Sequence, residues 1–220
     1  MGYFDKYHIF RDPVHGFIKV YDIERDIINS KAFQRLRRIK QLALTCLVYH
    51  GAEHTRFGHS LGVMEVASRI FDTIHQKDKS SGDNLLTSNF GWNDDDIEKY
   101  KIILRLWALL HDIGHCPFSH AADGLFEQKM DHVKMGSKII KEECNITDII
   151  NSLETEYGIN TQLISNLVGK ITPIDPSKLD FPFYVIKQII DGPLDADKID
   201  YLWRDSLFTG VYYGRFDLER

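Results

Sequence analysis

The sequence predicts an all-α protein with a small β element at its N-terminus. Apolar residues recur at helical spacing through most of the 220 residues, and only the first twenty residues show another pattern. The clearest helical repeat lies in 60–75, where Val63, Val66, Ala67 and Ile70 share one face. A chain of this length is typical of one domain, so we expect a single domain over 1–220.

The N-terminal third contains the predicted β element and two predicted helices. Residues 7–10 and 17–21 predict short β segments on either side of a turn at 12–16. Helical spacing then begins, and it predicts one helix over 31–43 and a second over 60–75. His59 therefore falls at or just before the N-terminus of the second helix.

A polar surface loop and a series of helices are predicted for the rest of the chain. The loop covers 76–96, because lysine, aspartate, serine and glycine dominate there. Asn93 or one of the three aspartates that follow it caps a long helix, which ends at His111 and Asp112. We expect further helices over 132–143, 159–168, 183–191 and 195–208, stop signals at Gly169 and Gly210, and a loop over 171–182.

Composition narrows the class of protein. The hydrophobic fraction of 43% and the charged fraction of 27% are ordinary for a soluble globular protein. No apolar run is long enough to predict a transmembrane helix. The net charge of −5 argues against a broad nucleic-acid surface, although residues 31–40 form one basic stretch. Three widely spaced cysteines predict a reducing, cytoplasmic setting without disulfides.

The pair His111-Asp112 follows a strongly apolar run over 102–110. Burying an imidazole and a carboxylate there is costly unless a partner satisfies both, and a metal ion does so. His59 lies upstream and Asp197 lies downstream, which completes a set of two histidines and two aspartates. Such a set suits Fe, Mn, Zn, Ni or Mg, and the sequence does not choose among these divalent metals.

A zinc-protease motif is the main alternative for this segment. His111 and His115 have the i, i+4 spacing of the His-Glu-x-x-His helix, with aspartate in place of glutamate. However, Gly114 and Pro117 predict that the helix ends here, and aspartate is one methylene short for the general base. The alternative also leaves His59, Asp123 and Asp197 without a role, so we disfavour it.

His120 and Asp123 form a candidate general-acid pair. They lie three residues apart on a helix predicted to begin near Pro117, so their side chains can meet. A carboxylate that accepts from an imidazole fixes its tautomer and raises its pKa, which favours a protonated histidine as the acid.

These motifs together resemble those of the HD-domain metal-dependent phosphohydrolases. The specific combination is Arg56-Phe-Gly-His-Ser-Leu-Gly62 followed by His111-Asp-Ile-Gly-His115 and Pro117-Phe-Ser-His120. Asp195-Ala-Asp-Lys-Ile-Asp-Tyr201 follows in the family's order. The resemblance is closest to the sterile-alpha-motif-and-HD-domain dNTP triphosphohydrolases and the bacterial dGTP triphosphohydrolases. It extends from about residue 8 to the C-terminus.

The resemblance implies a role for each candidate residue. His59, His111, Asp112 and Asp197 would hold the metal, and His120 with Asp123 would act at the scissile phosphate. Histidines that line the phosphates match His115 and His132. The substrate side would comprise Arg56 and Lys198 on the phosphates, Gln41 and Asp205 on the sugar 3′-hydroxyl, and Tyr201 beside a deoxyribose.

The implied function is hydrolysis of a deoxynucleoside triphosphate to deoxynucleoside and triphosphate. A divalent metal ion would serve as cofactor, with a second Mg²⁺ entering with the nucleotide, and the protein would be a homo-oligomer that binds no membrane. A different HD-type phosphohydrolase (a 5′-nucleotidase, nuclease or cyclic-nucleotide phosphodiesterase) and a nucleotide-binding regulatory module without turnover remain alternatives. The family's catalytic domain extends well beyond the second metal-binding aspartate, so we expect either a minimal version or a fragment of a longer protein.

Overall fold

The computed structural model describes residues 2–82, 85–88, 91–118, 130–170 and 181–214. A two-stranded antiparallel sheet opens the chain, formed by β1 (Tyr7–Asp12) and β2 (Gly16–Tyr21). Tyr7 pairs with Tyr21 and Asp12 pairs with Gly16. Gly16 has a φ of +76°, the left-handed region that glycine enters at little cost, so the hairpin can turn here.

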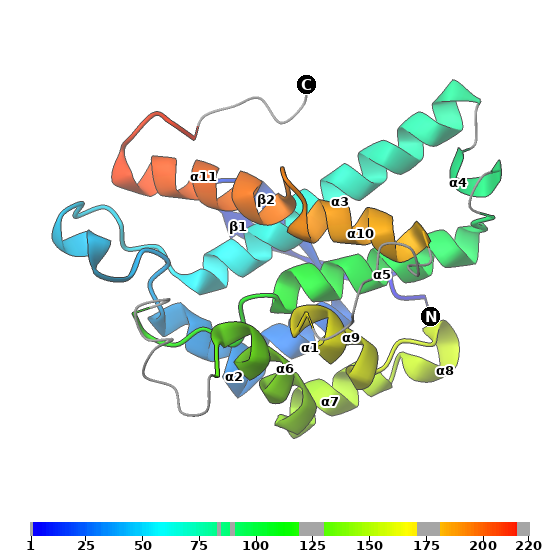
Figure 1. Ribbon diagram of the computed structural model, residues 1–220, viewed down its shortest axis with the longest axis horizontal. Helices are drawn as coiled ribbons and strands as arrows, with labels where there is room; N and C mark the ends of the chain where they lie inside the picture. Colours follow the sequence, from blue (N-terminus) through cyan, green and yellow to red (C-terminus); the bar gives the residue numbers. More distant parts are fainter. Residues whose placement is uncertain (1, 83–84, 89–90, 119–129, 171–180, 215–220) are drawn as a thin grey trace.

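Helices make up most of the remaining described chain (Figure 1). Their bounds are α1 (Asp22–Ile28), α2 (Lys31–Gln34), the 3₁₀ helices η1 (Arg35–Arg38) and η2 (Ala43–Leu47), α3 (Arg56–Ser81), α4 (Leu85–Ser88), α5 (Asp94–Leu110), α6 (His132–Glu142), α7 (Cys144–Asn151), α8 (Glu154–Tyr157), α9 (Thr161–Val168), α10 (Phe181–Asp191) and α11 (Ala196–Thr209).

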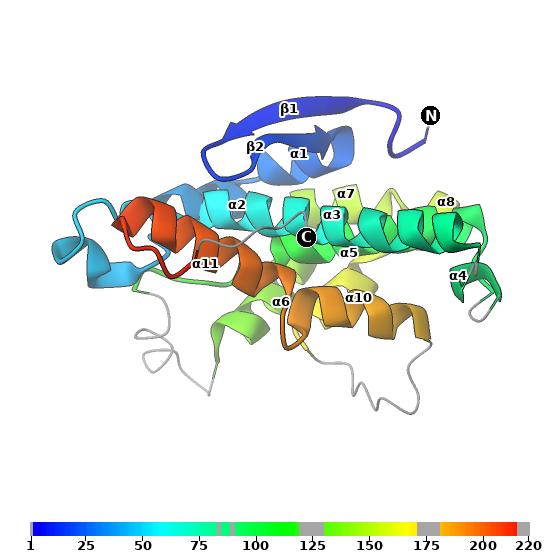
Figure 2. The same cartoon turned by 90° about the horizontal axis from the view of Figure 1, so that it is seen from above.

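The core is built around α3 and α5, which pack against each other near the centre of the molecule (Figure 1). Every residue of α5 from Ile102 to Leu110 is buried, so this helix is enclosed on nearly all sides. Helix α11 packs on α3, and α9 and α10 pack on α5. In Figure 2 the hairpin forms a separate layer on one side, with α6 and α10 on the opposite side.

Two buried charges join the hairpin layer to the core. Arg105 of α5 donates from Nε to Glu24 Oε1 at 2.5 Å and from Nη2 to Glu24 Oε2 at 2.8 Å. Its Nη2 also donates to the Lys19 carbonyl of β2 at 2.8 Å. A buried arginine needs such complete pairing, because an unpaired buried charge is very costly.

Most of the predicted elements are confirmed. The hairpin and the helices near 132–143, 159–168, 183–191 and 195–208 are present, with small shifts at their ends. Asn93 caps α5 by accepting from the Asp96 N–H at 2.9 Å, and Asp195 caps α11 in the same way. Gly210 ends α11 with a φ of +79°.

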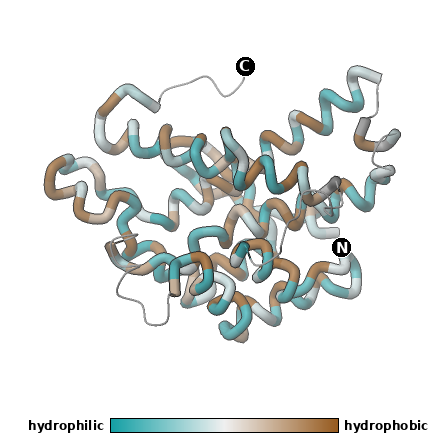
Figure 3. Tube along the Cα trace, in the orientation of Figure 1, coloured by the Kyte–Doolittle hydropathy of each residue, from teal (hydrophilic) through white to brown (hydrophobic). Residues whose placement is uncertain are grey.

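The single helix predicted over 31–43 is wrong. The segment forms α2 and then η1, after which Ile39 is extended and Lys40 pairs with Thr55. Phe33, Leu36 and Ile39 are all buried, and their three-residue spacing also suits a 3₁₀ turn. The following segment carries exposed Leu47 and Val48 and projects from the body, where Figure 3 shows apolar residues.

The loop predicted over 76–96 is also wrong in large part. Helix α3 continues to Ser81 and ends at Gly82, whose φ is +75°, and α4 follows. Lysine, glutamine and aspartate on an exposed helix face carry no apolar repeat, so periodicity alone does not detect them. Helix α7 was not predicted, and most of the predicted loop 171–182 lies outside the described residues. No described helix has both the length and the apolar content that crossing a membrane requires.

Candidate metal centre

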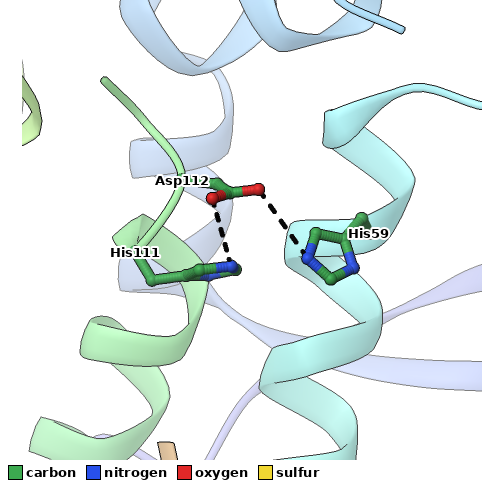
Figure 4. Close-up of side chains that lie close together, drawn as sticks. All are labelled: His59, His111 and Asp112. Carbon is green, nitrogen blue, oxygen red and sulfur yellow. Dashed lines mark ion pairs between the residues drawn. The ribbon is translucent and has the colours of Figure 1, made fainter. Parts of the chain in front are cut away.

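Three helix ends bring the four predicted metal ligands together. His59 lies in the first turn of α3, and Asp197 lies in the first turn of α11. His111 caps the C-terminus of α5, and Asp112 begins the turn that follows. Figure 4 shows the side chains of His111 and Asp112 facing His59 across the gap between α5 and α3.

The distances among these side chains are short enough for a shared ion. One ligand atom from each of His59, His111 and Asp112 lies within 4.8 Å of the other two. Asp197 Oδ1 lies 3.0 Å from His59 Nε2 and 3.9 Å from His111 Nε2. The structure thus gathers all four predicted ligands at one place.

Both imidazoles are oriented with Nε2 toward this gap. His59 Nδ1 donates to Asp200 Oδ2 at 2.7 Å, and His111 Nδ1 donates to the Ala108 carbonyl at 2.7 Å. With Nδ1 occupied in this way, the neutral ring presents the Nε2 lone pair, as metal-binding histidines do. His111 Nε2 is buried and has no hydrogen-bond partner among the described residues. A divalent cation would satisfy that nitrogen, so the residues fit a metal.

The metal-free site holds its charges at shifted pKa values. Burial disfavours charge on His59, but Asp197 and Asp200 outweigh it and raise the pKa of His59 to about 10. Burial would likewise raise the pKa of Asp112, but His111, Arg56 and His115 hold that pKa well below its ordinary value. The protonated His59 therefore supplies a positive charge between the Asp197 and Asp200 carboxylates. A metal bound at Nε2 would displace one proton from this ring.

Arg56 contacts a residue of the candidate metal centre, whereas the Lys198 ammonium contacts Gly192 and Asp195. The Arg56 Nη1 donates to Asp112 Oδ2, and both side chains are almost completely buried. Lys198 Nζ donates to the Gly192 carbonyl at 2.9 Å and to Asp195. The hydrogen bond with Asp195 is the main reason that the pKa of Lys198 is raised.

His115 and His132 lie face to face beside the His-Asp turn. Their ring centroids are 4.1 Å apart and the ring planes differ by 14°. Gly114 permits this approach, because a Cβ there would lie 1.9 Å from the His132 carbonyl oxygen. Burial lowers the pKa of His115 to about 4 despite the nearby Asp112, so this ring is neutral at pH 7.

The predicted sugar-binding residues surround a histidine that sequence reasoning missed. His54 Nε2 donates to Asp205 Oδ1 at 2.7 Å, and the Gln41 N–H donates to the His54 carbonyl at 3.0 Å. Gln41 Oε1 is buried and has no hydrogen-bond partner among the described residues. Tyr201 is half-buried on α11, one turn after Asp197.

Two further residues were missed, and one predicted pair is not described. Asp200 accepts from His59, and its place three residues after Asp197 was the available signal. Arg35 donates to the Ile113 carbonyl at 2.5 Å and the His115 carbonyl at 2.6 Å, which holds the His-Asp turn. The predicted general acid His120 and its partner Asp123 lie outside the described residues.

Comparisons with known proteins identify relatives of this chain. An uncharacterized protein of Bacillus subtilis, YwfO, is 36% identical over 216 residues, which cover 96% of this chain and 42% of that protein. The human deoxynucleoside triphosphate triphosphohydrolase SAMHD1 is 30% identical over 237 residues, which cover 98% of this chain and 35% of that protein. The chain thus spans roughly two fifths of the length of these curated relatives.

A solved structure and a family model also match this chain. The crystal structure of a hypothetical protein from Aquifex aeolicus matches 98% of this chain and 50% of its own, with a TM-score of 0.69 and 33% identity. The model of the HD domain matches residues 56–169, which is more than half of the chain and includes His59, His111 and Asp112. The chain therefore belongs to the HD-domain family.

Proposed function

We propose that this protein is a metal-dependent phosphohydrolase that acts on deoxynucleoside triphosphates. The observation that carries the proposal is the convergence of His59, His111, Asp112 and Asp197, with Arg56 bound to one of these carboxylates. A bound divalent metal would supply a Lewis acid and a water of lowered pKa. Two imidazoles and two carboxylates suit Fe, Mn, Zn, Ni or Mg.

The described side chains would bind and orient the phosphates. Arg56 presents a rigid set of N–H donors at the edge of the metal centre, where it can exchange its contact with Asp112 for a phosphate oxygen. His115 is neutral at pH 7, so it can bind a phosphate oxygen through one N–H but holds no second proton to release. The proton for the leaving 5′-oxygen would come from His120, oriented by Asp123.

Two observations support a deoxynucleoside triphosphate as the substrate class. Human SAMHD1 and its Dictyostelium discoideum homologue, both named deoxynucleoside triphosphate triphosphohydrolases, are 30% and 33% identical to this chain. The residues expected on the sugar, Gln41 and Asp205, are both joined to His54. A homo-oligomeric state, a cytoplasmic location and a second Mg²⁺ entering with the nucleotide remain predictions that accompany this proposal.

Product analysis tests the proposal. The protein is incubated with each dNTP, each NTP, a deoxynucleoside monophosphate and a short oligonucleotide, in the presence of Mn²⁺, Mg²⁺ or Fe²⁺, and the products are separated by chromatography. We expect deoxynucleoside and inorganic triphosphate from dNTPs. Cleavage of only monophosphates or internal phosphodiesters would place the protein among the nucleotidases or nucleases. Metal binding without any turnover would favour the regulatory module.

A pair of lysine variants tests the triphosphate preference. Lys198 of α11 pairs with Asp195, and Lys187 of the neighbouring helix α10 pairs with Asp191. Only Lys198 directly follows a residue of the candidate metal centre, Asp197. We expect Lys198→Ala to narrow the preference for triphosphates over monophosphates and Lys187→Ala to leave it unchanged. Equal preferences in the two variants would remove Lys198 from the phosphate site.

A further inference from the structure

A closed group of charges lies behind His59, on the side away from the metal ligands. At its centre, the Asp200 carboxylate is fully buried and accepts from three residues. His59 Nδ1 donates to Asp200 Oδ2 at 2.7 Å, and His15 Nε2 lies 2.6 Å from Asp200 Oδ1. Arg204 donates from Nε to Oδ2 and from Nη2 to Oδ1, both at 2.9 Å. Asp200 is thus the junction between the metal ligand and the rest of this group.

His15 comes from the turn of the N-terminal hairpin, far from Asp200 in the sequence. Its backbone N–H and that of Val14 both donate to Asp12 Oδ1, at 3.0 and 2.9 Å. Arg204 in turn donates to Asp12 Oδ2 at 3.0 Å. The turn is therefore fixed to α11 by the same arginine that binds Asp200, and it delivers the His15 ring to a defined position.

The direction of the His15 hydrogen bond follows from its surroundings. Arg204 donates to both oxygens of Asp200, and this bidentate pairing keeps the carboxylate ionised. The ionised carboxylate can only accept, so His15 Nε2 carries the proton. The His15 side chain has no exposed surface, and its ring packs edge-on against Trp203 with centroids 5.9 Å apart.

We propose that His15 is a positioning residue for the metal centre. By donating to Asp200, it fixes the carboxylate that orients the His59 imidazole, and so the hairpin turn sets the affinity of the site for its divalent metal. Loss of the direct partner of a metal-binding histidine typically costs about 10- to 100-fold in affinity, and His15 acts through that partner, Asp200, so we expect the lower end of this range. The proposal depends on the metal centre and is independent of the substrate.

The Glu24–Arg105 pair provides a matched control within the same layer. It is also buried, and it also anchors the hairpin, through the Lys19 carbonyl. Within the part of the chain that the structure describes, none of the hydrogen bonds of Glu24 or Arg105 reaches Asp200 or His59. Glu24→Gln therefore disturbs a buried charge pair and the hairpin anchor while leaving the group behind His59 in place.

Metal affinity is measured on the full chain for His15→Phe, His15→Gln, Glu24→Gln and the unaltered protein. Zn²⁺ dissociation constants come from competition with a chromophoric chelator, the Co²⁺ absorption spectrum reports ligand geometry, and thermal melting of the metal-free proteins reports stability. We expect His15→Phe to weaken Zn²⁺ binding by about 10-fold and to alter the Co²⁺ spectrum. His15→Gln, whose amide can still donate to Asp200, should stay within about threefold of the unaltered protein.

Glu24→Gln should lower the melting temperature at least as much as His15→Phe, with the Zn²⁺ affinity unchanged. If His15→Phe does not fold, His15→Asn replaces it, because the shorter amide does not reach Asp200. Unaltered Zn²⁺ affinity and Co²⁺ spectrum in the variant without the donor would overturn the proposal, as would equal weakening in Glu24→Gln. Since the readout is metal binding, a failure to hydrolyse nucleotides would leave this result unaffected.

Discussion

Gly62 of α3 faces the charged group behind His59, and its replacement by alanine gives a sharp test of that packing. A Cβ at this position would lie 1.8 Å from Asp200 Oδ1 and 2.5 Å from Arg204 Nη2. To reach ordinary van der Waals distance, the Asp200 oxygen would have to retreat by about 1.6 Å. Its hydrogen bonds with His15 and Arg204 are 2.6 and 2.9 Å long, so a retreat of that size breaks at least one of them.

The cost follows from the burial of these charges. Breaking a buried charge pair destabilises a protein by roughly 3–5 kcal/mol, and the better helix propensity of alanine recovers about 1 kcal/mol. We therefore expect Gly62→Ala to lower the free energy of unfolding by about 2–4 kcal/mol, which corresponds to roughly 5–15 °C in melting temperature. Urea unfolding monitored by tryptophan fluorescence measures this change.

Gly58→Ala is the matched control, because it makes the same substitution one turn earlier in the same helix. Its Cβ would meet the terminal nitrogen Nη1 of Arg204 at 3.3 Å, a contact that a shift of a few tenths of an ångström relieves. We expect a change within about 1 kcal/mol of zero. Equal unfolding free energies for the two variants would refute the close approach of α11 to α3 at Asp200.

Two other predictions concern the metal centre. Asp197→Asn keeps an oxygen near His59 but removes a negative charge. The metal content, measured by atomic emission, should therefore fall well below one ion per chain, and turnover should be lost. The control Asp191→Asn on α10 should retain both metal content and turnover. In the metal-free protein, the pKa of His115 is about 4 and that of His59 about 10, against an ordinary 6.5. Between pH 4 and 6.5, His115 is protonated in the unfolded chain but not in the native protein, so stability rises with pH. Between pH 6.5 and 10, His59 is protonated in the native protein but not in the unfolded chain, so stability falls with pH. Urea midpoints of chelated protein should therefore peak near pH 6.5, with changes of about 3 kcal/mol on the acid side and up to about 5 kcal/mol on the alkaline side. A stability that climbs steadily to pH 9 would contradict the His59 assignment.

The long buried helices were predictable because one simple pattern specifies them. The apolar run of α5 and the apolar repeat in α3 indicate a helix whatever the tertiary arrangement is. The capping residues Asn93 and Asp195 mark where α5 and α11 begin. The segment 31–43 was not predictable in this way. A spacing of three buried residues fits both an α-helix and a 3₁₀ turn, and the strand-like bridge between Lys40 and Thr55 that ends the helix is a tertiary contact.

The candidate metal ligands could be located in the sequence for a different reason. A histidine and an aspartate at the end of an apolar run violate the usual preference for apolar interiors, so the sequence itself marks the place. Their partners carry no such mark. His15, His54 and Asp200 are ordinary polar residues in the sequence, and only the packing of the hairpin turn and α11 against α3 brings them to buried positions.

The helix ends explain why such a site needs a cation. His59 and Asp197 lie in first turns, where the helix dipole is positive and favours the carboxylate, but Asp112 follows the C-terminus of α5, where the dipole disfavours it. Arg56 donates to that carboxylate, and despite burial His111, Arg56 and His115 hold its pKa well below the ordinary value, while Asp197 and Asp200 raise the pKa of His59. Under the proposed function, a phosphate would bind Arg56 and a metal would displace the proton of His59. The unfavourable position of the Asp112 charge would therefore be best compensated when metal and phosphate are bound together. The same unfavourable position, a charged residue at the end of an apolar run, is what singled out the His-Asp pair in the sequence.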